Sequence, residues 1–189
     1  MKRVYTGIDF AKFFFACMIP FLHIPFNDSP AITFVRQYIS RLGVPCFFAI
    51  SGFFLKQAMN DRGRVPALLH YEKRVGRLLI TWLVIYSPIL IASSSNMLKF
   101  VQEVLFLTPA FLWYLTALLV AAIPFCLIKN RKALWLISIV LYLFGTLQGE
   151  NYSWLTGGAP RLYTTIFLTT RNGVFFALPL MCAGGSKLL

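Results

Sequence analysis

Long apolar stretches alternate with short polar connections along the chain, and this pattern predicts its secondary structure. A helix of about 20 apolar residues crosses the roughly 30 Å hydrocarbon core of a bilayer. The stretches that approach this length are Asp9 to Phe26, Arg41 to Met59, Arg77 to Ala92, Pro109 to Ile128, Ala133 to Leu147 and Gly173 to Leu189. We therefore expect an all-α protein, a polytopic transmembrane helical bundle of about six spans.

The basic residues between these stretches predict the orientation of the bundle. With the N-terminus in the cytoplasm, all but five of the 18 Lys and Arg residues fall on the cytoplasmic side; the five are Arg36, Arg41, Lys99, Arg161 and Arg171. Cytoplasmic loops of membrane proteins carry such an excess, so the N-terminus is expected inside. The apolar runs Leu98 to Leu107 and Leu162 to Leu168 are too short to cross and are candidates for re-entrant segments.

Composition supports the membrane assignment. The chain has 189 residues, 58% hydrophobic and 13% charged, with a formal net charge of +12, whereas a soluble domain has roughly 25% charged residues. The mean hydropathy is +0.71. Because the basic residues lie between apolar runs, we expect a lipid bilayer as their partner and no nucleic acid. Residues 1–189 are expected to form a single transmembrane domain, with a retained first helix.

No metal site or bound cofactor is expected. The cysteines are widely spaced, with no C-x-x-C pair and no His at metal-ligand spacing. They are interpreted as small packing residues.

The first apolar stretch contains two ionisable residues, Lys12 and His23. Their spacing places them on one face of a helix, about 16 Å apart. Ionisable side chains within a membrane are candidates for function because they are costly to bury. Each also has an ordinary interpretation. His23 would be an interfacial residue bonded to a loop, and Lys12 an anchor paired at i,i+3 with Asp9.

Four short motifs follow one another in an informative order. Gly7-Ile8-Asp9-Phe10-Ala11-Lys12 precedes His23, and Phe47-Phe48-Ala49-Ile50-Ser51-Gly52-Phe53-Phe54-Leu55, Lys73-Arg74-Val75-Gly76-Arg77 and Leu112-Trp113-Tyr114-Leu115 follow. This series resembles the membrane-bound acyltransferase family 3, which includes the membrane domain of vancomycin-resistance serine racemases. Lysine stands at position 12, and again at 73, where the family pattern has arginine.

The resemblance implies a function and a location. Family members are taken to move an acyl group, often acetyl, from acyl-CoA to a hydroxyl of an envelope glycan or similar acceptor, so we expect an O-acyltransferase in the bacterial inner membrane. The family fold usually has more helices than this chain supplies. The chain therefore looks like its N-terminal part, with helices from a missing C-terminal portion as possible partners.

Site residues follow from the matched motifs. The resemblance implies His23 as the base that removes the acceptor proton, and Lys12, Lys73, Arg74 and Arg77 as the residues that bind acyl-CoA phosphates. The alternative for the last three is a cluster that marks the cytoplasmic boundary and meets anionic lipid. His70, in the same basic segment, is assigned no role.

The remaining motif residues, Asp9, Ser51, Gly52 and Trp113, are interpreted as packing residues. Small residues at 51 and 52 would allow close helix approach, and no G-x-S-x-G motif supports Ser51 as a nucleophile. Two alternative functions stay open. One is a serine or small-solute transport or binding domain of the serine-racemase membrane type, with His23 lining the path, and the other is an inactive fragment.

Overall fold

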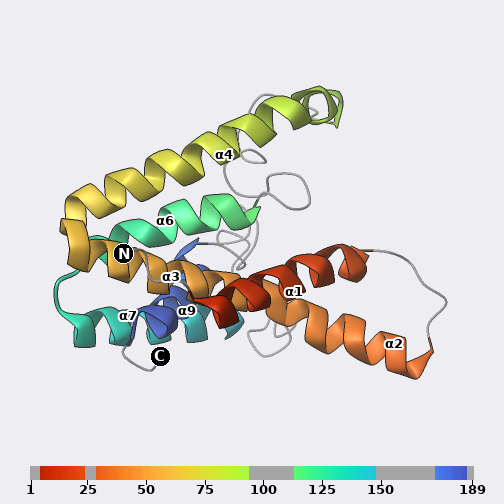
Figure 1. Ribbon diagram of the computed structural model, residues 1–189, viewed down its shortest axis with the longest axis horizontal. Helices are drawn as coiled ribbons and strands as arrows, with labels where there is room; N and C mark the ends of the chain where they lie inside the picture. The colour runs from red at the N-terminus through yellow and green to blue at the C-terminus, as the bar shows by residue number, and fades with distance from the viewer. Residues whose placement is uncertain (1–4, 24–28, 94–112, 148–172, 187–189) are drawn as a thin grey trace.

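The computed structural model describes residues 5–23, 29–93, 113–147 and 173–186, and within these ranges the chain is helical throughout, with short connections and no strand. Figure 1 shows α3 through the middle of the molecule, with α6 and α4 on one side and α7 and α9 on the other. The helical segments are α1 (Thr6–His23), α2 (Pro30–Phe34) continuous through η1 (Val35–Ile39) and η2 (Ser40–Leu42) with α3 (Gly43–Arg62), α4 (Arg64–Ser93), α6 (Trp113–Leu127), α7 (Arg131–Leu147), and η4 (Gly173–Ala177) continuous with α9 (Leu178–Gly185). The expected all-α class is confirmed.

The described part of each of the six apolar stretches is helical, but the second and third helices begin more than ten residues before their apolar part. The second begins at Pro30, where Ser29 accepts a hydrogen bond from Ile32 N at 3.4 Å, a capping arrangement with proline at the first helical position. The third begins at Arg64, because Lys, Arg, Glu and Leu favour helix whether or not they are apolar. The runs 98–107 and 162–168 lie outside the described residues.

Local signals explain where these helices end and restart. Gly63 has φ 87° and donates its N–H to Met59 O at 3.0 Å. This left-handed residue closes α3 and lets α4 begin at the next position. Asn130 begins α7, since its Oδ1 accepts from the backbone N of Lys132 and Ala133 at 3.0 and 3.2 Å. Both turns lie at the same end of the bundle, where α3 meets α4 and α6 meets α7 (Figure 1).

The core lies between α3, α6 and α9. Phe48, Phe125 and Met181 are completely buried there. The closest approach is between α3 and α9, where a Cβ on Gly52 would lie 2.6 Å from Met181 Cα and one on Gly184 would lie 2.8 Å from Ala49 Cα. The two helices are therefore separated by backbone alone at this crossing.

One described helical stretch, Pro30–Arg62, is both long and apolar enough to cross a bilayer by length and composition. Trp113–Leu127 and Phe175–Gly184 are apolar but shorter. Many large apolar side chains on the outer faces are exposed, for example Phe13 at 70% and Val84 at 66%. The number of spans stays a prediction.

Candidate functional site

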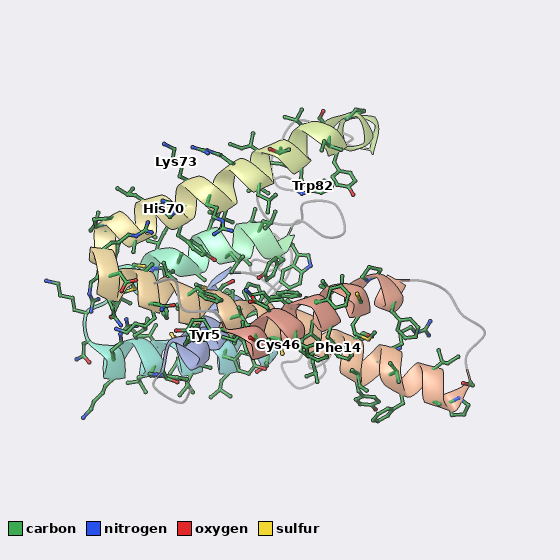
Figure 2. All side chains as sticks on the ribbon, in the orientation of Figure 1. Tyr5, Phe14, Cys46, His70, Lys73 and Trp82 are labelled. Carbon is green, nitrogen blue, oxygen red and sulfur yellow. The ribbon has the colours of Figure 1, made fainter. Side chains whose placement is uncertain are left out.

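A basic groove lies on the outer face of α4. His70, Lys73, Arg74 and Arg77 line a hollow of about 330 Å³, and all four side chains are exposed. Figure 2 shows Lys73 pointing away from the helices beneath α4, with His70 on the same helix. Their spacing, i, i+3, i+4 and i+7, places them on one face of the helix. We call these four residues the basic groove.

The basic groove is strongly electropositive. Among the residues that the structure describes, none that lines it carries a carboxylate. Lys and Arg side chains in this arrangement suit phosphate, which Arg holds with its forked N–H donors. The structure therefore brings together the three sequence-predicted phosphate-binding residues of α4 and adds His70, which the sequence interpretation left without a role.

Lys12 lies elsewhere. It belongs to α1, where its Nζ is 2.9 Å from Asp9 Oδ1 and 4.6 Å from the ring centroid of Phe54 on α3. The i,i+3 partner that the sequence suggested is therefore present, and Asp9 is its ion-pair partner. Lys12 is not among the residues that line the basic groove.

His23 is the last residue of α1. Its side chain lies outside what the structure describes, so its role as a base stays a prediction. Pro20, one turn earlier, is accommodated within the helix, which continues to His23.

The other motif residues take part in packing. Gly52 faces α9 at the close crossing. Trp113 begins α6, and its ring centroid lies 6.2 Å from that of Phe48 and 6.4 Å from that of Phe176. The half-buried Ser51 on α3 lies near the hydroxyls of Tyr71 and Tyr114. These positions hold α3, α6 and α9 together beside α4.

Behind the basic groove, the inner face of α4 carries polar groups that the sequence interpretation missed. Glu72 Oε1 is buried and has no hydrogen-bond partner within the described residues. The Tyr71 hydroxyl is buried beside Ser51. Desolvation by burial raises the pKa of Glu72 to about 7 and raises that of Tyr71. The sequence contained one signal of this, because Glu72 is the single acidic residue in the segment from Arg64 to Arg77. Glu72 does not neutralise the basic groove, because it faces the opposite side of the helix.

Two arginines lie at the end of the bundle where α4 and α7 begin. Arg64 NH1 donates to the carbonyls of Cys126 and Ile128 at 3.1 and 3.2 Å, where α6 ends. Arg131 lies with its guanidinium carbon 5.0 Å from the ring centroid of Phe125. Burial, and then the charge of Arg64, lower the pKa of Arg131.

The described residues contain no group of three or more His, Cys, Asp or Glu side chains arranged to hold a metal ion. Cys126 is buried with its thiol 3.6 Å from Met59 Sδ, as expected of a packing residue.

Comparison with known proteins identifies relatives of this chain. A family described as "Acyltransferase domain" matches residues 5–186. Two Enterococcus faecalis proteins, each named "Amino-acid racemase", are 30% and 32% identical over 210 and 201 residues, alignments that cover 97% and 96% of this chain. The chain spans only 29% and 28% of the length of these relatives. No solved structure matches it.

Proposed function

Because the chain belongs to the acyltransferase family that matches residues 5–186, we propose that it is a membrane-bound O-acyltransferase. It moves an acyl group, acetyl in the simplest case, from acyl-CoA to a hydroxyl of an envelope glycan or similar acceptor. The match over nearly the whole chain carries this proposal. The basic groove supports it, because CoA is a donor with several phosphates.

The proposal places the chain in the bacterial inner membrane as a multi-pass bundle with a cytoplasmic N-terminus. Its support is the apolar stretch Pro30–Arg62, the exposed apolar side chains of α1, α4 and α7, and the distribution of basic residues. In this orientation the N-terminal part of α4 lies at the cytoplasmic surface. The basic groove then opens where CoA is available.

The donor binds through its phosphates. Lys73, Arg74 and Arg77 contact the phosphates while the acyl thioester enters the bundle. Lys12 contributes positive charge from α1, where its Nζ pairs with Asp9 at 2.9 Å and lies 4.6 Å from the ring centroid of Phe54 on α3. A lysine at this position supplies charge without the two-pronged geometry of arginine.

His23 acts on the acceptor. Its imidazole accepts the proton of the acceptor hydroxyl as the oxygen attacks the thioester carbonyl. The new ester C–O bond forms and the C–S bond breaks. The CoA thiolate leaves and takes up the proton, which returns the imidazole to its neutral form.

The test is transfer of labelled acetyl from acetyl-CoA in membranes that contain the chain. The wild type labels an envelope acceptor, His23→Ala abolishes labelling, and Arg74→Ala/Arg77→Ala chiefly raises the KM for acetyl-CoA. Lys132→Ala, which removes an exposed charge of α7, serves as the control and leaves transfer unchanged. A well-inserted wild type that transfers no label would exclude acyl transfer by this chain.

A second candidate function is transport or binding of serine or another small solute. The observation that favours it is the name of the two relatives, "Amino-acid racemase", since a membrane domain joined to a racemase would serve the same amino acid. In proteoliposomes this function gives serine flux that depends on His23, with no label transfer. An inactive fragment gives neither flux nor transfer.

A further inference from the structure

The basic groove is longer than one phosphate group requires. Seven positions separate its first and last residues, His70 and Arg77, which corresponds to about 10 Å along a helix. A single phosphate is satisfied by two or three donors from neighbouring positions. A groove of this length, lined by four nitrogen-bearing side chains, fits a ligand with two phosphate groups set apart from each other.

The direction of α4 assigns each end of the groove to a part of the donor. Basic residues lie in the first half of the helix, and exposed apolar side chains such as Ile80, Val84 and Ile85 follow Arg77. In the proposed orientation, Arg77 is the groove residue nearest the membrane, and His70 lies farthest from it. The acyl end of CoA must enter the membrane, so its diphosphate lies toward Arg74 and Arg77. Its 3′-phosphate is on the ribose that carries the diphosphate, on the side away from the acyl chain, and lies toward His70.

We infer that His70 determines donor specificity by binding the 3′-phosphate of CoA, with Lys73 beside it. This inference rests on the proposed acyl-CoA donor. An imidazole offers an N–H donor in either tautomer, and a proton added to its second nitrogen makes the bond to phosphate charge-assisted. The groove thereby distinguishes CoA from donors that carry the diphosphate alone.

The charges around His70 are consistent with an anionic ligand. Lys73, Arg74 and Arg77 share its face, whereas the acid of the same segment, Glu72, is half-buried on the opposite side of the helix and lies near Cys126 of α6. No acidic residue of the described chain lines the groove to compete for the imidazole. An anion at this end would therefore relieve repulsion among the groove cations.

The experiment compares two ligands that differ only in the 3′-phosphate. The chain is placed in nanodiscs of neutral lipid, and the dissociation constants of acetyl-CoA and acetyl-dephospho-CoA are measured by titration for the wild type, His70→Gln and Lys132→Gln. We expect wild type to prefer acetyl-CoA about tenfold, as a charge-assisted contact at an exposed site allows. His70→Gln should weaken acetyl-CoA about fivefold and change acetyl-dephospho-CoA by less than about twofold. Lys132→Gln should change neither.

Equal weakening of both ligands by His70→Gln, or no weakening of either, would overturn the inference. Nanodiscs with anionic lipid test whether lipid headgroups, a second source of phosphate, occupy the groove in place of CoA. If acetyl-CoA binds to neither nanodisc and the groove residues instead govern affinity for anionic vesicles, the groove holds lipid headgroups and the inference fails. Transfer activity is measured in parallel. Selective binding without transfer supports the inference and defeats the proposed reaction. Transfer, together with a His70→Gln variant that keeps the full wild-type preference for acetyl-CoA, defeats the inference alone.

Discussion

The crossing of α3 and α9 makes a sharp prediction for Gly52→Ala. A Cβ at this position would lie 2.6 Å from Met181 Cα and 2.7 Å from its carbonyl carbon, whereas packed carbon atoms prefer separations of about 3.5–4.0 Å. The obstructing atoms belong to the backbone of α9 and cannot rotate away. The two helices must therefore move about 1 Å apart to admit one methyl group.

The expected cost follows from the effects of overpacking elsewhere. Extra carbon in a well-packed core destabilises by about 1–3 kcal/mol. For a chain of this size each kcal/mol lowers the Tm by roughly 2–4 °C, so Gly52→Ala should lower the Tm by about 2–12 °C. The separation also loosens the crossing of Gly184 against Ala49, which places the effect toward the upper part of that range.

Gly76→Ala is the matched control. A Cβ on Gly76 meets nothing within 4 Å, so the same substitution there only improves helix propensity, by about 1 kcal/mol. Unfolding of both variants is followed in detergent micelles by tryptophan fluorescence against temperature. Opposite shifts, down for Gly52→Ala and up for Gly76→Ala, are expected. A Gly52→Ala variant as stable as the wild type would refute the backbone contact between α3 and α9.

Three further changes test other parts of the structure. Burial raises the pKa of Glu72 from 4.5 to about 7, so the folded state binds a proton that the unfolded state releases; the wild-type Tm should fall as pH rises from about 5 to 8, and Glu72→Gln should flatten that slope. Asn130→Ala removes the cap of α7 and should cost about 1 kcal/mol, seen as a lower Tm. Lys12→Met, which breaks the exposed pair with Asp9, should change stability by less than about 1 kcal/mol, and a larger loss of Tm would show that the pair is more than a surface contact.

The sequence predicted the helices well and their beginnings less well. Hydropathy detects the part of a helix that suits a membrane, so it placed the third stretch at Arg77 although α4 begins at Arg64. The intervening segment includes Arg64, Glu72, Lys73 and Arg74, which lower its hydropathy but favour helix. In the same way the second stretch was placed at Arg41, while the helix begins at Pro30, because Arg36 and Gln37 interrupt apolarity without interrupting helix.

Helical spacing made part of the candidate site predictable. Lys73, Arg74 and Arg77 share a face by their positions alone, and His70 satisfies the same spacing three and four residues earlier. By contrast, the burial of Glu72 depends on how α4 packs on α3 and α6. The spacing of residues along one helix does not show which neighbouring helix packs against a given face.

The contact from Arg64 to the carbonyls of Cys126 and Ile128 joins residues 62 and 64 positions apart, and this separation has a consequence for the order of assembly during synthesis. At about 5–20 residues per second, Arg64 leaves the ribosome several seconds before the carbonyls that it binds. The turn at Gly63 is complete within α3 and α4 and needs nothing that follows. The α3–α4 pair can therefore form first, with the Arg64 guanidinium in place as a hydrogen-bond donor. The C-terminal end of α6 then docks against it once its carbonyls have been synthesised.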